Sequence, residues 1–254
     1  MPPDDPSADL DDGQYSLDAI RKYEAVYGRD FVSPGGAATT RALLGLAALA
    51  PGARVLDVGS GLGGAAFLLA RECGAHVHGI DLSQNMLRLA AERCNAAGLS
   101  ALVTFERADV LRYQPPAPFD LVHSRDVFLH IGDKPALLRA LASCLRPGGQ
   151  LLFTDYLCGA GPRSPAFAAY IAARGYDLRT LSEYKELIES AGLAVELAED
   201  RTAEFCAILA RELAGIAEAP LAPHERDELA RSWRDKLARA EAGEQRWGVL
   251  LARR

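Results

Sequence analysis

Residues 55–64 read VLDVGSGLGG, and this stretch decides the fold. A short apolar run ends on Asp57 and then breaks into glycines at Gly59, Gly61 and Gly64. A strand that runs through such a turn into a helix presents backbone N–H groups to a ligand at the carboxyl edge of a sheet. The spacing of the glycines alone fits a dinucleotide site. A carboxylate two residues before Gly59 would repel a pyrophosphate, however, so Asp57 favours a ligand with a cationic group.

Short β-rich runs alternate with longer helical stretches around this turn. The pattern predicts strands at 54–59, 76–81, 102–109, 119–125, 150–156, 193–200 and 247–253. Between the first five strands it predicts helical segments near 64–73, 83–97 and 134–145. This order predicts an α/β fold with a doubly wound, Rossmann-like sheet of seven strands and right-handed crossovers. The final run is expected to return as an edge strand.

The chain has 254 residues, of which 49% are hydrophobic, and this is enough for one α/β core. We expect a disordered acidic tail at 1–12, followed by one domain at 13–254. The first part of that domain, 13–50, is predicted to form a helical cap. Helical lid insertions are predicted at about 157–190 and 203–244, where they can cover the carboxyl edge of the sheet. Open α/β sheets bind their ligands at that edge.

The formal net charge is −6, and five aspartates lie in the first twelve positions. The nearly neutral remainder argues against nucleic-acid binding. The tail lacks an apolar core, so it does not resemble a signal or transit peptide. No apolar run approaches the roughly 20 residues needed to cross a bilayer. We expect a soluble, cytoplasmic monomer with no membrane insertion.

Cysteines and histidines give no indication of a metal site. The five cysteines are odd in number and lack C-x-x-C spacing, which favours reduced cysteines in the core. His76 and His78 alternate along a predicted strand, and packing or hydrogen bonding explains them better than metal ligation. We therefore expect no metal.

Aspartates end three consecutive predicted strands, at Asp57, Asp81 and Asp109. Any one of them alone could cap a helix. Together they suit a nucleoside ligand, with Asp57 beside an ammonium group, Asp81 on the ribose hydroxyls and Asp109 on the adenine amino group. Val110 would then pack on the adenine ring. The pattern D-x-G-x-G-x-G, completed by Gly63, resembles motif I of class I methyltransferases.

That resemblance implies S-adenosylmethionine as the cofactor and S-adenosylhomocysteine as its product. It extends the expected donor contacts to residues of the cap, the glycine turn and the segments after two strands. These are Val32, Ser33, Gly59, Ser60, Gly61, Leu82, Met86 and Arg125.

The fourth predicted strand leads into SRDVFLH, residues 124–130, which contains a candidate base. His130 is the main candidate, although a lone histidine after apolar residues is more often structural. Asp126 precedes it by four residues, which on a helical turn places both side chains on one face. A carboxylate there could orient the imidazole or bind a cationic amine.

Longer stretches carry a more specific resemblance. They include GQYSLDAIRKYEAVYGRDFVSPGG (13–36), the glycine turn, SRDVFLH, TDYL (154–157), YIAARGYDLRTLSEY (170–184) and QRWG (245–248). From about residue 13 to its end, the chain resembles the phosphoethanolamine N-methyltransferases of plants, nematodes and malaria parasites. In length it is similar to the single-domain parasite form.

This resemblance implies N-methylation of phosphoethanolamine and of its mono- and dimethyl forms to phosphocholine. It implies that Tyr15 closes over the site and pairs with His130. Gln14, Tyr23 and Asp126 are implied to lie near the amine. The residues implied to hold the phosphate are Tyr156, Tyr170, Arg174, Tyr176 and Lys236.

The chemistry of these residue types supports the same function. Tyr170 and Arg174 are four residues apart in a predicted helix and project together. Arginine, lysine and phenol groups suit a phosphomonoester. An ammonium group with a pKa of about 10 must lose a proton before it attacks, and His130, if its pKa stays close to about 6.5, could accept that proton directly or through water.

Three alternatives remain open from the residues. One is a methyltransferase for another small amine, of the glycine or sarcosine type, which gives the phosphate residues no role. Another is an NAD-dependent oxidoreductase, which fits the glycine spacing but not Asp57. The third is a non-catalytic regulator that binds the donor, in which the base and the phosphate residues would be expected to be lost.

Overall fold

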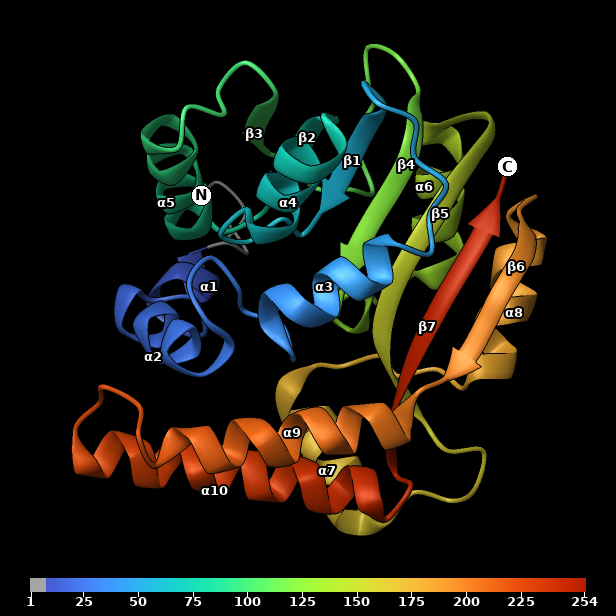
Figure 1. The fold of residues 1–254 in the computed structure, drawn as a ribbon. Coiled ribbons are helices and arrows are strands. Elements are labelled where there is room, and N and C mark those ends of the chain that lie inside the picture. Colours follow the sequence, from blue (N-terminus) through green and yellow to red (C-terminus); the bar gives the residue numbers. More distant parts are fainter. Residues whose placement is uncertain (1–7) are drawn as a thin grey trace, which may run out of the picture.

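A seven-stranded sheet runs through the computed structural model, which describes residues 8–254 of the chain (Figure 1). The strand order is β3-β2-β1-β4-β5-β7-β6. The strands are β1 (Arg54–Val58), β2 (His76–Asp81), β3 (Val103–Arg107), β4 (Phe119–Arg125), β5 (Leu145–Cys158), β6 (Ala194–Asp200) and β7 (Gln245–Arg253). The first five are parallel, and β7 runs antiparallel to β5 and β6. The predicted doubly wound, Rossmann-like α/β fold is confirmed.

The final strand does not lie at the edge of the sheet, so that expectation is wrong. β7 is hydrogen-bonded to β5 on one side and to β6 on the other, which makes β6 the edge strand. Both Val249 and Leu250, which point to opposite faces of β7, are fully buried. A continuous apolar run is typical of a strand covered on both faces. The edge prediction rests only on the position of the run at the end of the chain.

Ten α-helices and one 3₁₀ turn join these strands within residues 8–254. They are α1 (Ala8–Asp12), α2 (Leu17–Tyr27), α3 (Gly36–Leu44), α4 (Gly64–Cys73), α5 (Gln84–Ala96), η1 (Phe128–His130), α6 (Lys134–Cys144), α7 (Pro165–Arg174), α8 (Leu181–Ser190), α9 (Thr202–Ile216) and α10 (Pro223–Glu241). No helix in this part of the chain is long and apolar enough to cross a bilayer.

Neighbouring residues of β1 contribute to two different cores. Val55 packs in a core with residues of α3, α4 and α9, whereas Leu56 packs in one with residues of α6 and α8. Because side chains alternate across a strand, these cores lie on opposite faces of the sheet. The five cysteines are free thiols, and three of them are buried.

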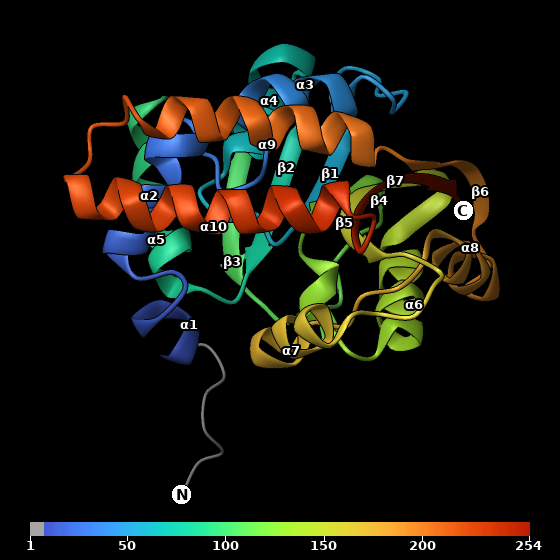
Figure 2. The same cartoon turned by 90° about the horizontal axis from the view of Figure 1, so that it is seen from below.

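A pair of antiparallel helices, α9 and α10, crosses the carboxyl ends of the parallel strands (Figures 1 and 2). Figure 2, seen from below, shows the two helices side by side in front of the sheet. Arg21 of α2 donates a hydrogen bond to Glu225 in the first turn of α10, which fastens the N-terminal cap to this pair. The pair occupies the region where the second lid insertion is predicted.

Residues 8–12, at the end of the predicted acidic tail, form α1. The carboxylate of Asp11 accepts hydrogen bonds from Ser83 Oγ (2.5 Å), Gln84 N (3.0 Å) and Asn85 N (3.2 Å). An acidic side chain is favourable at a helix N-terminus, where backbone N–H groups lack partners. The disorder predicted for residues 1–7 lies outside the described residues.

The glycine turn after β1 has a backbone that glycine adopts most easily. Gly59, Gly61 and Gly63 have φ angles of 67°, 52° and 84°. A Cβ atom added at Gly59 would lie 2.3 Å from Val127 Cγ2, far inside contact distance. Gly59 is therefore required both for conformation and for space.

We expect Gly59→Ala to lower the free energy of unfolding by roughly 2–4 kcal/mol, from backbone strain and the collision with Val127. Gly52→Ala is the matched control, since Gly52 has a φ of 77° but no atom within 4 Å of its added Cβ. It is expected to cost about 1 kcal/mol. Urea unfolding measures both variants. If both variants lose the same free energy of unfolding, the lack of space beside Val127 is not what requires glycine at position 59.

Candidate active site

A cavity of about 320 Å³ opens at the carboxyl ends of β1 and β2. We call it the donor cavity. Seven residues predicted to bind the donor line it: Gly59, Gly61, Asp81, Leu82, Met86, Asp109 and Val110. Leu10 of α1 also lines it, so this short helix covers part of the cavity.

Asp81 is fixed between the glycine turn and α5. Its Oδ2 accepts a hydrogen bond from Gly61 N (2.8 Å), and its Oδ1 accepts one from Ser83 N (2.9 Å). Burial raises the pKa of this carboxyl group. A carboxylate has about four lone-pair positions, so these two bonds leave acceptors for a ligand. Asp109, in the loop after β3, accepts a hydrogen bond from Leu111 N (2.9 Å), and its Oδ2 lies 3.9 Å from Arg112 Nε.

A narrow cavity of about 30 Å³ shares Gly59 with the donor cavity. It holds the remaining predicted donor contacts, which are Val32, Ser33, Asp57, Ser60 and Arg125. Asp57 Oδ1 pairs with His123 Nδ1 (2.7 Å), while its Oδ2 is buried and has no hydrogen-bond partner within residues 8–254. A buried acceptor without a partner is costly, so this atom fits a ligand that donates a hydrogen bond.

Arg125 is engaged by the cap. Its guanidinium donates to Thr40 Oγ1 (2.6 Å) and to Pro34 O (2.8 Å), which holds the SPGG break against β4. Burial lowers its pKa. These bonds hold the loop that carries Val32 and Ser33 against Arg125. The contact of Arg125 with a donor stays a prediction.

A third cavity, of about 120 Å³, shares three residues with the donor cavity. We call it the acceptor cavity. It brings together all ten residues predicted for catalysis and substrate binding: Gln14, Tyr15, Tyr23, Asp126, His130, Tyr156, Tyr170, Arg174, Tyr176 and Lys236. Tyr15, His130 and Arg174 are the shared residues. A group transferred between ligands in the two cavities would pass this wall.

His130 ends the η1 turn at the wall between the two cavities. Its ring meets that of Tyr176 edge to face, with centroids 5.1 Å apart. Burial, together with the positive charges of Lys134 and Arg174, lowers the pKa of His130 to about 4. In the free protein, the pKa of His130 therefore does not stay close to 6.5. The imidazole is neutral at pH 7, which is the state that can accept a proton.

Tyr15 belongs to the turn that precedes α2, and its side chain lines both cavities. Its phenol oxygen accepts a hydrogen bond from Gln14 Nε2 (3.2 Å), and its backbone oxygen accepts one from Asn85 Nδ2 of α5 (3.0 Å). Burial, with Asp81 nearby, raises the pKa of the phenol, so the group stays protonated at neutral pH. The pairing of Tyr15 with His130 stays a prediction.

Asp126 does not share a helical turn with His130, so that part of the prediction is wrong. Its φ is 56°, in the left-handed region, and η1 begins only at Phe128. Asp126 Oδ1 accepts hydrogen bonds from Thr154 Oγ1 (2.9 Å) and Trp247 Nε1 (2.8 Å). These bonds from β5 and β7 hold the carboxylate in the acceptor cavity, where its buried Oδ2 has no hydrogen-bond partner within residues 8–254.

Three cationic side chains line the acceptor cavity, and each lies over an aromatic ring. Lys236 Nζ is 4.8 Å from the ring centre of Trp233, and Arg174 Cζ is 5.8 Å from that of Tyr170. Arg239 Cζ is 3.9 Å from the same Tyr170 ring. Arg239 and Trp233 were missed in the sequence, although both lie three residues from Lys236 and so share its face of α10.

A buried network behind His130 was also missed. Lys134 is fully buried and its Nζ donates to Phe128 O (2.7 Å), Ile131 O (2.6 Å) and Asp177 O (2.9 Å). Asp155 accepts a hydrogen bond from Leu129 N (3.0 Å) and has a pKa raised by burial to about 7. The turn that carries His130 is thus held on both sides by hydrogen bonds.

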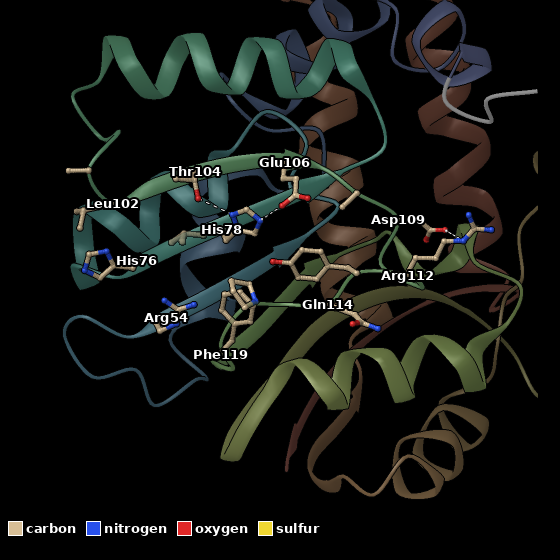
Figure 3. Close-up of a pocket in the computed structure, with 15 residues that line it drawn as sticks. Arg54, His76, His78, Leu102, Thr104, Glu106, Asp109, Arg112, Gln114 and Phe119 are labelled. Atoms are coloured by element: carbon tan, nitrogen blue, oxygen red, sulfur yellow. Dashed lines mark hydrogen bonds and ion pairs between the residues drawn. The ribbon is translucent and has the colours of Figure 1, made fainter. Parts of the chain in front are cut away.

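A larger cavity, of about 590 Å³, lies on the face formed by β1, β2 and β3 (Figure 3). It adjoins the donor cavity, with which it shares Ala108 and Asp109. There His78 lies between Thr104 Oγ1 (2.9 Å) and Glu106 Oε2 (3.1 Å). No cluster of three or more His, Cys, Asp or Glu side chains within residues 8–254 could hold a metal ion. The donor and acceptor cavities are therefore the candidate active site.

Comparisons with known proteins agree with this assignment. A family model described as a methyltransferase domain matches residues 55–149. A phosphoethanolamine N-methyltransferase of Triticum aestivum is 44% identical over 249 residues, which are 95% of this chain and 49% of that protein. The chain thus spans about half the length of its plant relatives.

Two further relatives come from parasites. The structure of phosphoethanolamine N-methyltransferase 2 of Haemonchus contortus, in complex with phosphomonomethylethanolamine and S-adenosylhomocysteine, superposes with a TM-score of 0.92. It is 35% identical and covers 96% of this chain and 59% of its own. The phosphoethanolamine N-methyltransferase of Plasmodium falciparum is 30% identical over 254 residues, which are 96% of this chain and 94% of that protein. The chain belongs to the phosphoethanolamine N-methyltransferase family.

Proposed function

We propose that this chain methylates the amine of phosphoethanolamine and of its mono- and dimethyl forms, with S-adenosylmethionine as methyl donor, to yield phosphocholine. The observation that carries the proposal is the acceptor cavity, which places a carboxylate and a neutral imidazole in the same space as three cations. A phosphobase has the complementary charges, an ammonium group at one end and a phosphate at the other. The named activities of the relatives from wheat, Plasmodium and Haemonchus support the same substrate class.

The donor cavity and its narrow extension fit S-adenosylmethionine. Asp57 has a buried oxygen without a partner, suited to the ammonium group of the donor, and Asp81 retains acceptors for the ribose hydroxyls. Asp109 and Val110 line the donor cavity but not the narrow cavity that holds Asp57, and we assign them to the adenine. When bound, this cofactor supplies an electrophilic methyl group on a sulfonium.

The acceptor residues then prepare the nitrogen for attack. Asp126 attracts the ammonium group through its Oδ2, which lies 3.8 Å from Arg125 but accepts no hydrogen bond within residues 8–254. His130 accepts one proton from the ammonium group, directly or through water. The freed lone pair forms the new N–C bond in line, as the S–C bond breaks and its electrons return to sulfur. Tyr15, fixed by Gln14 and Asn85, positions the amine, so much of the rate enhancement is orientation.

After His130 has released its proton to water, the methylated ammonium group can lose its next proton to it, and this repeats until three methyl groups are present. The quaternary product has no proton and no lone pair, so the sequence stops at phosphocholine. Aromatic faces of Tyr15, Tyr23 and Tyr176 around the cavity can stabilise the growing methylammonium charge. Both cavities are lined by one chain, and we propose that it acts as a monomer.

Calorimetric titration tests this function. The protein is saturated with S-adenosylhomocysteine and titrated with phosphoethanolamine and, separately, with ethanolamine. Binding of the phosphorylated amine alone is expected, and methyl transfer to it from labelled donor should follow in an activity assay. Binding of S-adenosylhomocysteine without either amine would contradict the proposed acceptor but not the donor site.

The phosphate end of the cavity should also give a pH dependence. Burial lowers the pKa of Lys236 to about 8, and repulsion from Arg239 and Arg174 adds to this, against the attraction of Glu212 and Asp126. Lys236 is therefore protonated below about pH 8 and loses its charge above it. We expect the KM for phosphoethanolamine to rise as pH increases through this value.

Lys236→Met removes the titrating group and is expected to have a higher KM that changes little across the same pH range. Measuring KM from about pH 7 to about pH 9 separates the two cases, because the substrate ammonium group titrates only near pH 10. The KM for the donor serves as an internal control. Parallel pH profiles of the two proteins would show that another group is responsible.

A further inference from the structure

Three cations in the acceptor cavity lack the carboxylate partners that many other arginines of this protein have. No carboxylate within residues 8–254 lies within 4 Å of Arg174, Lys236 or Arg239. By contrast, Arg93 pairs with Glu24 (2.6 Å) and Asp30 (2.9 Å). Aromatic faces support the three cations and take none of their N–H donors for conventional hydrogen bonds. Apart from Arg239 Nε, which donates to Gln245, their donors are therefore available for an anionic ligand.

Arg239 is the most firmly placed of the three. Its guanidinium carbon lies 3.9 Å from the centre of the Tyr170 ring. Its Nε donates to Gln245 Oε1 (3.1 Å), and Gln245 is a fully buried residue of β7. This bond uses one of the five N–H donors of the guanidinium, so the terminal nitrogens keep theirs. A ring on one side and a buried amide on the other fix the orientation of the group.

The three cations are also close enough to repel one another. Burial lowers the pKa of Lys236, and the charges of Arg239 and Arg174 contribute to the same shift. Grouping like charges in a partly buried cavity costs free energy when no anion is bound. A ligand with two negative charges relieves this repulsion more than a ligand with one.

We infer that Arg239 is a specificity-determining residue, which acts with Arg174 and Lys236 to recognise the doubly charged phosphate of the acceptor. This inference rests on the proposed function and deepens it. A phosphate monoester offers three terminal oxygens, one for each cation, and carries two charges above its second pKa of about 6. The cavity should therefore prefer a phosphate monoester to an isosteric sulfate monoester, which carries one charge.

The test compares phosphoethanolamine with ethanolamine O-sulfate, which has nearly the same shape. Both are titrated calorimetrically at about pH 7.5, above the second phosphate pKa of about 6, into protein saturated with S-adenosylhomocysteine. Wild-type protein is expected to bind the phosphate ester more tightly. Arg239→Gln should lose about 10- to 100-fold in affinity for the phosphate ester and clearly less for the sulfate ester, since a charged hydrogen bond contributes about 1.5–3 kcal/mol. Arg239→Lys should recover part of the preference.

Arg234→Gln is the matched control, because Arg234 is an exposed residue of the same helix. It should bind both esters like the wild type. Equal losses for the two esters in Arg239→Gln would overturn the inference, since Arg239 would then only support Tyr170. Unchanged binding in that variant would overturn it as well.

Failure of the proposed function has a different signature, in which wild-type protein binds S-adenosylhomocysteine but neither ester. The affinity for S-adenosylhomocysteine also reports whether each variant is folded. If Arg239→Gln does not bind S-adenosylhomocysteine, Arg239→Lys is the variant that tests the inference. A reduced preference of Arg239→Lys for the phosphate ester supports the inference, and an unchanged preference overturns it.

Discussion

Replacing His130 with alanine should lower kcat by about 10²–10⁴-fold, the range that a positioned acid–base group contributes. His130 lines both cavities and is neutral in the free protein, since burial lowers its pKa to about 4. Without it, the ammonium proton has no nearby acceptor other than water or the carboxylate of Asp126. The affinity for S-adenosylhomocysteine should stay nearly unchanged, because the aspartates of the donor cavity are untouched. Rapid-quench measurement of a single turnover, with the donor saturating, gives the chemical step directly.

His130→Gln provides a second variant, which keeps a polar group on the η1 turn but cannot accept the proton as imidazole does. It should be as slow as His130→Ala, and added imidazole should restore part of the rate in the alanine variant. If kcat is unchanged in both variants, His130 is not the base. A large loss of donor affinity would instead indicate that His130 supports the wall between the two cavities.

Arg174→Ala should raise the KM for phosphoethanolamine by about 10- to 100-fold, because a charged hydrogen bond to phosphate contributes roughly 1.5–3 kcal/mol. Arg174 has no carboxylate partner within 4 Å among residues 8–254, so its charge is available for the substrate. Transfer to ethanolamine, which lacks the phosphate, should be equally slow in wild type and variant. Steady-state kinetics with both amines measures this difference.

Arg211→Ala is a suitable control for Arg174→Ala, since Arg211 is exposed on α9. It should leave the KM for both amines at the wild-type value. Arg174→Lys should recover part of the affinity, because lysine keeps the charge but lacks the planar pair of donors. An Arg174→Ala variant that is impaired equally with both amines would contradict a phosphate role.

Local patterns in the chain were sufficient to predict much of the fold and many of the residues that come together in the site. The glycine spacing that begins at Gly59 requires a turn after β1, whatever surrounds it, because side chains are strained at positive φ. Aspartates at the ends of parallel strands must lie at one edge of the sheet, which is how Asp81 and Asp109 come to line one cavity. The resemblance to a family supplied the rest of the acceptor cavity, including Lys236 on α10.

Other features had no local signal. β7 lies inside the sheet because residues of β5 and β6 pair with it, and those pairings join segments far apart in the chain. Asp126 has a left-handed backbone and is held by Thr154 and Trp247, so counting four residues to His130 misplaced it. The spacing of residues along the chain does not reveal a hydrogen bond between distant segments.

The amino-acid sequence alone therefore determined the α/β architecture, the glycine turn and the types of group available for a methyl donor and a phosphobase. This is because strand and helix periodicity and turn chemistry act over a few neighbouring residues. Tertiary structure alone decided the protonation of His130, the unpaired oxygen of Asp57 and the place of Arg239 beside Tyr170. Each of these depends on which segments exclude water from the group and which hydrogen-bond donors those segments place beside it. Burial and pairing of this kind are set only when the whole chain is packed.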